Sequence, residues 1–223
     1  MPSITAKQVR NSKIRKGEYP DPKLKTKEAE EEIKVMSSAL GAWNLGFLDI
    51  ETTGLGADFG FVLGACIKPA NSDKIITYRI DDYKGYRKNL CDDKQLVLDI
   101  AKGVEDFDAI CHYNGEMFDL PFLDTRLAIH GVHKRVSLIH SIDLLPIVKK
   151  KMRLNSNKLE TVACALGLSE EKTRLLPQVW QQASHGSKKD LDYIIEHCEK
   201  DVLVLEEAFK RLKGFIDTIF RRR

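Results

Sequence analysis

The sequence has no apolar run that approaches the roughly 20 residues needed to cross a bilayer, although 43% of its 223 residues are hydrophobic. The N-terminus is basic and polar, without the apolar core of a secretory signal. The five cysteines include no C-x-x-C pair, so we expect reduced thiols rather than disulfides or a zinc site. These absences favour a cytoplasmic protein that makes no membrane contact.

The length suits one domain with a sizeable core, and no internal repeat interrupts the chain. We predict a flexible basic arm at 1–25, a leading helix at 26–43, a globular domain at 44–214 and a basic tail at 215–223. The net charge is only +3, but Lys and Arg are concentrated at the two ends. These ends are either solvated, frayed termini or arms that attract a polyanion through counterion release.

The hydrophobic pattern of the globular part predicts an α/β protein. Three short β-rich runs, at 44–51, 59–67 and 74–80, are separated by turn segments and indicate a meander. A helix at 93–107, a strand at 108–115, a helix at 119–131, a strand at 136–144 and then mainly helical sequence follow. We therefore expect a mixed five-stranded β-sheet flanked by α-helices.

Two acids interrupt the first strand, in the stretch FLDIETTGL. Residues i and i+2 of a strand point to the same side, so Asp49 and Glu51 converge while Ile50 faces the core. Two like charges held together repel each other unless a cation neutralises them, and a hard divalent cation with oxygen ligands does so directly. The alternative is that one acid pairs with a lysine and the other caps the turn at 52–54.

Two further acids occupy matching positions. Asp119 follows the strand at 108–115 and starts a helix, where an N-cap is its simplest role. Asp201 lies near the edge of the buried stripe of a long helix, and His197 is one turn earlier on the same face. Each acid alone is weak evidence for a functional site, whereas the four acids in this order are strong evidence for one.

The motifs LDIETTGL, YNGEMFDLPFL and HCEKDV resemble the three motifs of the DEDD 3′–5′ exonucleases, which have a ribonuclease H-like fold. The segment at 140–168 is similar to the proofreading domain of archaeal-type family B DNA polymerases, and equally to related stand-alone exonucleases. The resemblance covers about Asn44 to Lys210. It implies that the domain at 44–214 is a ribonuclease H-like exonuclease domain.

The resemblance implies a metal-binding quartet of Asp49, Glu51, Asp119 and Asp201 that holds two divalent cations, Mg²⁺ or Mn²⁺. In this family the residue at Asp49 bridges both ions, those at Glu51 and Asp201 hold the first, and that at Asp119 supports the second. Two such ions stabilise the attacking and the leaving oxygen during in-line hydrolysis of a phosphodiester.

His197 departs from the family pattern, because a histidine occupies the position of a tyrosine four residues before the last acid. An imidazole has an ordinary pKa of about 6.5, which suits a general base near neutral pH. We expect His197 to orient or deprotonate the attacking water. The alternative is a partly exposed helix histidine, with Lys200 or a water doing the orienting; Tyr193 lies too far along the helix.

The same motifs imply contacts to substrate. The expected substrate-binding residues are Thr52, Thr53, Gly54, Leu55, Asn114 and Phe118. Backbone N–H groups of the first turn would meet the 3′ end, Leu55 would wedge between bases, and Phe118 would stack on single-stranded substrate. For Leu55 and Phe118 the alternative is ordinary core packing, and Gly115 is expected to let the turn approach the nucleic acid.

Other candidates have weaker support. We expect Asp143 to cap a helix or support the site, and His130 and His133 to be loop residues. Trp180 and the stripe at 159–168 are expected in the core. A helix is expected to begin near Ser156, where Asn157 and Lys158 are minor candidates for phosphate contacts.

These observations favour a metal-dependent 3′–5′ exonuclease that releases nucleoside monophosphates from single-stranded ends. Its alternatives are a structure-selective endonuclease using the same site, a non-catalytic nucleic-acid-binding module and, more remotely, a small-molecule phosphodiesterase. The resemblance to proofreading domains favours DNA over RNA and allows a replication or repair protein as partner. Discrimination by the 2′-hydroxyl depends on short-range contacts that the sequence does not show.

Overall fold

The computed structural model describes residues 43–70, 72–168 and 175–216. They belong to one unit, Trp43–Arg223. The expected basic arm at 1–25 lies outside the described residues, as do the leading helix at 26–43 except Trp43 and the basic tail at 215–223 except its first two residues.

A mixed sheet of five strands, in the order β3-β2-β1-β4-β5, forms the centre of this unit. The strands are β1 (Leu45–Thr52), β2 (Val62–Pro69), β3 (Ile76–Arg79), β4 (Ala109–His112) and β5 (His140–Asp143). The first three pair antiparallel, whereas β1 with β4 and β4 with β5 pair parallel. The expected meander and mixed sheet are confirmed, and β1 occupies the central position.

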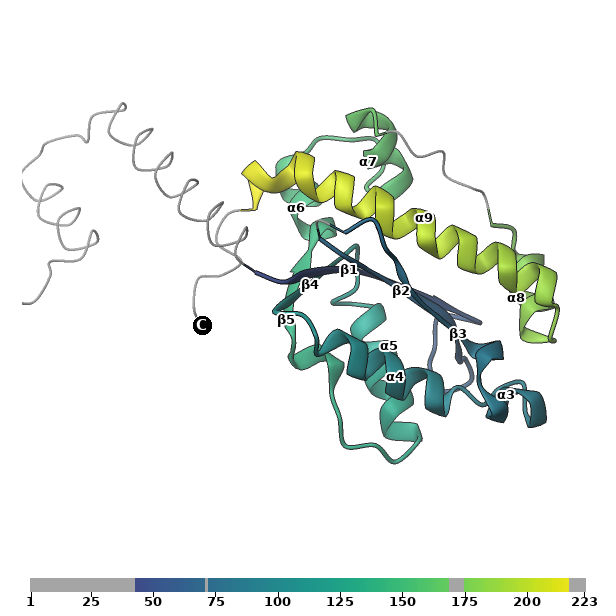
Figure 1. Ribbon diagram of the computed structural model, residues 1–223. Coiled ribbons are helices and arrows are strands. Elements are labelled where there is room, and N and C mark those ends of the chain that lie inside the picture. The colour runs from purple at the N-terminus through teal and green to yellow at the C-terminus, as the bar shows by residue number, and fades with distance from the viewer. Residues whose placement is uncertain (1–42, 71, 169–174, 217–223) are drawn as a thin grey trace, which may run out of the picture. The chain divides into compact units, whose positions relative to one another are not determined.

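Helices cover both faces of the sheet (Figure 1). They are η1 (Ile80–Asp82), α3 (Lys84–Lys88), α4 (Lys94–Val104), α5 (Asp119–Ile129), η2 (Val136–Leu138), α6 (Leu144–Lys151), α7 (Leu159–Leu166), α8 (Pro177–Ser184), α9 (Lys188–Leu212) and η3 (Lys213–Phe215). The long α9 crosses one face over β1 and β2, and α4 and α5 lie on the opposite face. None of the described helices is long and apolar enough to cross a bilayer.

Because both faces are covered, β1 is apolar along its first half rather than alternating. Residues 45–48 are all buried. On the α9 side, Gly64 of β2 allows close packing, since a Cβ there would lie 2.2 Å from Ile195 Cδ1. The helix α9 therefore sits close over the sheet, which fixes its side chains relative to β1.

Most of the expected strands and helices differ from the observed ones at their boundaries, β3 (expected at 74–80) and β4 (expected at 108–115) among them. The second strand begins at Val62 rather than at 59, because Thr53 N–H donates to Phe61 O at 3.1 Å and closes the preceding loop. The fifth strand covers only His140–Asp143, since 136–138 form a 3₁₀ turn. The helix expected near Ser156 begins at Leu159.

A buried ionic cluster joins α4, α5 and the loop that follows β1. Arg126 donates to both carboxylate oxygens of Asp93, at 2.9 and 2.8 Å, and to Ala57 O at 3.0 Å. His130 Nε2 lies 2.6 Å from Asp93 Oδ1, and Val62 N–H donates to Asp93 Oδ2. His130 is thus a member of this cluster rather than a simple loop residue, and the cluster anchors loop 53–61 at Ala57 and the start of β2 at Val62.

Arg126→Ala is expected to lower the free energy of unfolding by about 3–5 kcal/mol, because it leaves the Asp93 carboxylate buried without its main partner. Urea unfolding of the full chain measures this. The matched control is Lys188→Ala, which removes an ion pair to Asp192 with side chains 72% and 49% exposed and is expected to cost less than about 1 kcal/mol. Equal effects of the two substitutions would contradict a structural role for the cluster.

Candidate active site

Three elements bring the four predicted acids to the carboxyl end of β1. Asp49 and Glu51 are on β1 itself. Asp119 is the first residue of α5, which follows the neighbouring parallel strand β4. Asp201 is on α9, which packs over β1, and Cys198 Sγ of the same helix lies 3.4 Å from the Asp49 backbone oxygen.

The electrostatics of Asp49 show how close the four carboxylates are. Burial raises the pKa of Asp49 well above its ordinary value, and the negative charges of Asp201, Glu51 and Asp119 raise it further, in that order. Like charges within a few ångströms disfavour one another's ionised form. The charges of Asp201, Glu51 and Asp119 therefore all act on Asp49, which places the four acids in one neighbourhood.

Asp119 is buried, and burial raises its pKa to about 7, with a smaller contribution from the charge of Asp143. Hydrogen bonds from the backbone N–H groups of Asp119 itself and Ile50 oppose this shift. The N-cap of α5 is Phe118, and no side chain caps that end. The N-cap role considered for Asp119 is therefore wrong, and its carboxylate points toward β1 instead.

Glu51 has a partner that the sequence does not reveal. Its Oε2 accepts a hydrogen bond at 3.0 Å from the indole Nε1 of Trp180 on α8. Trp180 was expected in the core; it packs against the core only partly and also reaches the site. No motif marks this contact, because it joins residues 129 positions apart.

His197 lies beside the last acid on α9, with its Nε2 3.6 Å from Asp201 Oδ2. The residue is only 7% exposed, which does not match the alternative of a partly exposed helix histidine. Lys200, the other candidate for orienting water, forms an ion pair with Glu196 at 2.7 Å. The geometry thus places an imidazole next to the acids, as its position in the motif predicted.

The loop between β4 and α5 is held by Asp143. This carboxylate accepts hydrogen bonds from the N–H groups of Asn114 at 2.8 Å and Glu116 at 3.2 Å. It also caps α6 by accepting from Leu145 N–H at 2.9 Å. Both roles expected for Asp143 are confirmed, and this single side chain fixes the path that leads to Asp119.

His112, which no sequence motif marks, also supports this loop. Its Nδ1 accepts from Gly115 N–H at 3.0 Å, and its Nε2 lies 2.7 Å from Ser141 Oγ. Burial lowers the pKa of His112 to about 4, so the ring is neutral and carries its proton on Nε2. A Cβ at Gly115 would lie 2.5 Å from this ring, so the glycine is needed for packing on His112.

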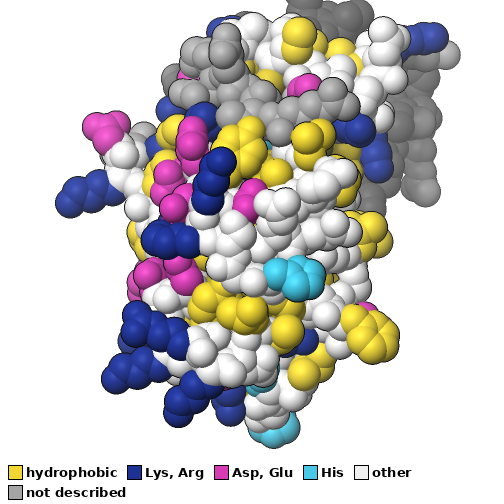
Figure 2. Space-filling view, turned by 90° about the vertical axis from the view of Figure 1, so that its right-hand side faces the viewer, with side chains coloured by type: hydrophobic (Ala, Val, Ile, Leu, Met, Phe, Trp, Pro, Cys, Tyr) yellow, Lys and Arg dark blue, Asp and Glu magenta, His cyan; other side chains and the backbone are white. Residues whose placement is uncertain are grey.

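A cleft of about 440 Å³ lies beside Glu51. It is lined by Ile50, Glu51, Thr52, Thr53, Gly54, Leu55, Phe118, Pro177, Trp180 and Gln181. Leu55 is 88% exposed, so core packing does not explain it, while Phe118 also packs on Phe122. Figure 2 shows the side toward which the carboxyl end of β1 points, where exposed hydrophobic side chains gather above a group of Lys and Arg.

Five of the six expected substrate-binding residues line this cleft, at 52–55 and at Phe118. Asn114 does not line it; its backbone adopts a positive φ of 69° in the loop held by Asp143. The minor candidate Asn157 accepts a hydrogen bond from the Tyr113 hydroxyl through its backbone oxygen. The structure thus separates a cleft-lining group from residues that shape the adjoining loop.

A family model described as the RNase H superfamily matches residues 46–213. The chain belongs to the RNase H superfamily. A DNA polymerase from Methanocaldococcus jannaschii is 29% identical over 124 residues, covering 45% of this chain and 7% of the polymerase. The family B DNA polymerase of Pyrobaculum calidifontis has a similar fold, with a TM-score of 0.61 and 18% identity over 76% of this chain and 24% of the polymerase.

These comparisons confirm the ribonuclease H-like fold and the similarity to family B DNA polymerases, and they support an RNase H-type nuclease. The chain spans only a small part of the length of either polymerase. The match to the superfamily includes all four acids and His197. Within this RNase H fold the acids lie at the carboxyl end of the central strand.

The donor set fits a hard divalent cation. All four side chains offer carboxylate oxygens, which are the ligands that Mg²⁺ and Mn²⁺ prefer, and their mutual repulsion would be relieved by positive charge. Within 43–70, 72–168 and 175–216, no group of three His, Cys, Asp or Glu side chains is already arranged around one point. A cation would therefore have to draw the carboxylates of this RNase H-type site closer together.

The raised pKa of Asp119 predicts a pH dependence of stability in the absence of divalent cations. A carboxyl whose pKa is 3.8 when unfolded and about 7 when folded stabilises the fold below pH 4, and this contribution is lost as the pH rises through 7. With EDTA present, the unfolding free energy of the wild type should fall between pH 5 and 8, relative to Asp119→Asn, by on the order of 2 kcal/mol.

Chemical unfolding at several pH values measures this difference, and Asp73→Asn, at an exposed position, serves as the matched control. The unfolding free energy of this control should change with pH in the same way as that of the wild type. If the unfolding free energy of Asp119→Asn also changes with pH in the same way as that of the wild type, Asp119 does not cause the pH dependence.

Proposed function

We propose that this protein is a metal-dependent 3′–5′ exonuclease that hydrolyses phosphodiester bonds at the 3′ end of single-stranded nucleic acid and releases nucleoside 5′-monophosphates. The observation that carries the proposal is the group of four carboxylates around Asp49, next to a cleft with apolar and aromatic walls. Buried like charges beside a ligand-sized cleft are costly for stability, and such arrangements concentrate at functional sites.

Asp49, Glu51, Asp119 and Asp201 would hold two divalent cations, Mg²⁺ or Mn²⁺. When bound, such ions supply a water activated for attack and neutralise the charge that develops on the leaving 3′ oxygen. The carboxylates are fixed by the backbone of β1, by the first turn of α5 and by α9. Their positions therefore do not depend on a mobile loop.

His197 is the chain's own candidate for handling the proton of the attacking water. Its ring lies 3.6 Å from Asp201 and is almost fully buried. A neighbouring carboxylate orients an imidazole and stabilises its protonated form. His197 would thus accept the proton of the attacking water with the Asp201 carboxylate beside it.

The cleft supports the proposed preference for single strands. Leu55 projects from the turn after β1 with 88% exposure, and Phe118 lines the same cleft. Base faces reach such side chains only when they are unstacked from a partner strand. Thr52 Oγ1 donates to Gly54 O at 2.8 Å and Thr53 N–H donates to Phe61 O, so the turn that would meet the 3′ end is rigid.

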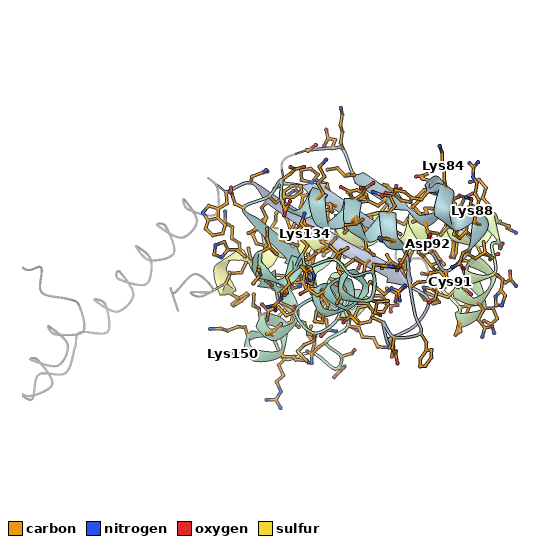
Figure 3. All side chains as sticks on the ribbon, turned by 90° about the horizontal axis from the view of Figure 1, so that it is seen from below. Lys84, Lys88, Cys91, Asp92, Lys134 and Lys150 are labelled. Atoms are coloured by element: carbon orange, nitrogen blue, oxygen red, sulfur yellow. The ribbon has the colours of Figure 1, made fainter. Side chains whose placement is uncertain are left out.

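The similarity to DNA polymerases favours DNA over RNA. It also makes a replication or repair protein a suitable partner, whereas the cytoplasmic location expected from the sequence stays a prediction. In the view of Figure 3, Lys84 and Lys88 on α3 lie near each other and away from Lys134 and Lys150. Binding of the strand is expected to depend mainly on the cleft and the bound cations.

A time course with 5′-labelled single-stranded DNA and RNA of one sequence tests the proposal. In Mg²⁺ or Mn²⁺ we expect a descending ladder of products one nucleotide apart, formed faster on DNA. The ladder should disappear with EDTA and in the Asp49→Ala variant, because removing the central carboxylate removes ligands for both ions.

A circular single strand is the matched control, since an exonuclease has no end to attack there. Cutting of the circle would indicate a structure-selective endonuclease, and binding without cleavage of either strand would indicate a non-catalytic module. In the same assay His197→Ala should lower turnover about 10²–10⁴-fold, and unchanged turnover would rule out its role as base.

A further inference from the structure

The indole of Trp180 links the expected metal ligand Glu51 to the wall of the cleft. Its Nε1 donates to Glu51 Oε2 at 3.0 Å, and its side chain lines the same cleft as Leu55 and Phe118. The residue belongs to α8, which packs against α9. The contact therefore ties the helix layer above the sheet to the acid at the end of β1.

The chemistry of this hydrogen bond suits a metal ligand. An indole N–H only donates and an ionised carboxylate only accepts, so the two groups match as donor and acceptor. It occupies roughly one of the four lone-pair positions of a carboxylate. The same carboxylate can thus bind a cation while Trp180 holds it.

Glu51 needs such a partner more than the other acids do. Its backbone pairs with Gly64 of β2, but a glutamate side chain has one more rotatable bond than an aspartate and loses more rotamer entropy when ordered. Asp119 receives two backbone hydrogen bonds, and Asp201 has His197 beside it. Glu51 accepts its hydrogen bond from Trp180 on a different helix.

We propose that Trp180 is a positioning residue that fixes the Glu51 carboxylate for binding of a divalent cation. It acts through Glu51 and does not itself contact the ion. The inference rests on the proposed function, because fixing Glu51 in this way matters only if the four carboxylates bind metal. It predicts a defect in metal affinity that a loss of packing alone would not produce.

Binding of Mn²⁺ to the full chain, followed by the electron paramagnetic resonance signal of the free ion, tests this inference without an activity assay. Trp180→Phe keeps an aromatic ring but removes the donor, and it should weaken Mn²⁺ binding about 10-fold, the usual cost of losing a hydrogen bond to a metal ligand. The matched control is Trp43→Phe, at a ring that packs on His140 before β1, which should leave Mn²⁺ affinity unchanged.

A double-mutant cycle with Glu51→Gln separates positioning from packing. If Trp180 acts through Glu51, Trp180→Phe should change Mn²⁺ affinity less than about 2-fold in the Glu51→Gln background. Thermal unfolding in EDTA should show that the variants are folded. Unchanged or tighter Mn²⁺ binding by Trp180→Phe, or equal losses in both backgrounds, would overturn the inference, whereas a wild type that binds no Mn²⁺ would instead refute the proposed metal site.

Discussion

The mutual repulsion of four carboxylates at the carboxyl end of β1, of which those of Glu51 and Asp119 are buried, is the constraint on which the rest of the structure depends. Burial and three neighbouring charges raise the pKa of Asp49 well above its ordinary value, so in the absence of a cation this group opposes folding at neutral pH. The remaining structure holds the group in place. The strand β1 is held by its central position in the sheet, and α9 is held by its close packing over Gly64.

Support for the site comes from three separate sets of contacts. Asp143 and His112 hold the loop before Asp119, Trp180 holds Glu51, and the Arg126–Asp93 cluster anchors the loop after β1 on the opposite side of the sheet. Fully hydrogen-bonded buried networks of this kind rigidify their surroundings. The acids therefore sit on rigid elements, as precise chemistry requires.

The sequence predicted those features that depend on local spacing. The i, i+2 spacing of Asp49 and Glu51 and the i, i+4 spacing of His197 and Asp201 place each pair on one face before any tertiary contact is known. Trp180 and Arg126 could not be assigned in this way, because their partners are distant in the chain. His112 bonds to nearby Gly115 but also to distant Ser141, and no spacing rule marks a buried histidine that supports a loop. The late start of β2 has the same origin, since loop 53–61 is closed by contacts at its two ends. Superfamily membership gives the fold, whereas activity has to be argued from the site.

Anomalous diffraction from crystals of the full chain grown with Mn²⁺ tests the central claim most directly. We predict two Mn²⁺ peaks about 3.5–4 Å apart at the carboxyl end of β1, with Asp49 contacting both and Glu51, Asp119 and Asp201 completing the ligand set. Mn²⁺ bound only elsewhere, or no peak near Asp49 at saturating Mn²⁺, would contradict the claim that these four carboxylates form a cation site.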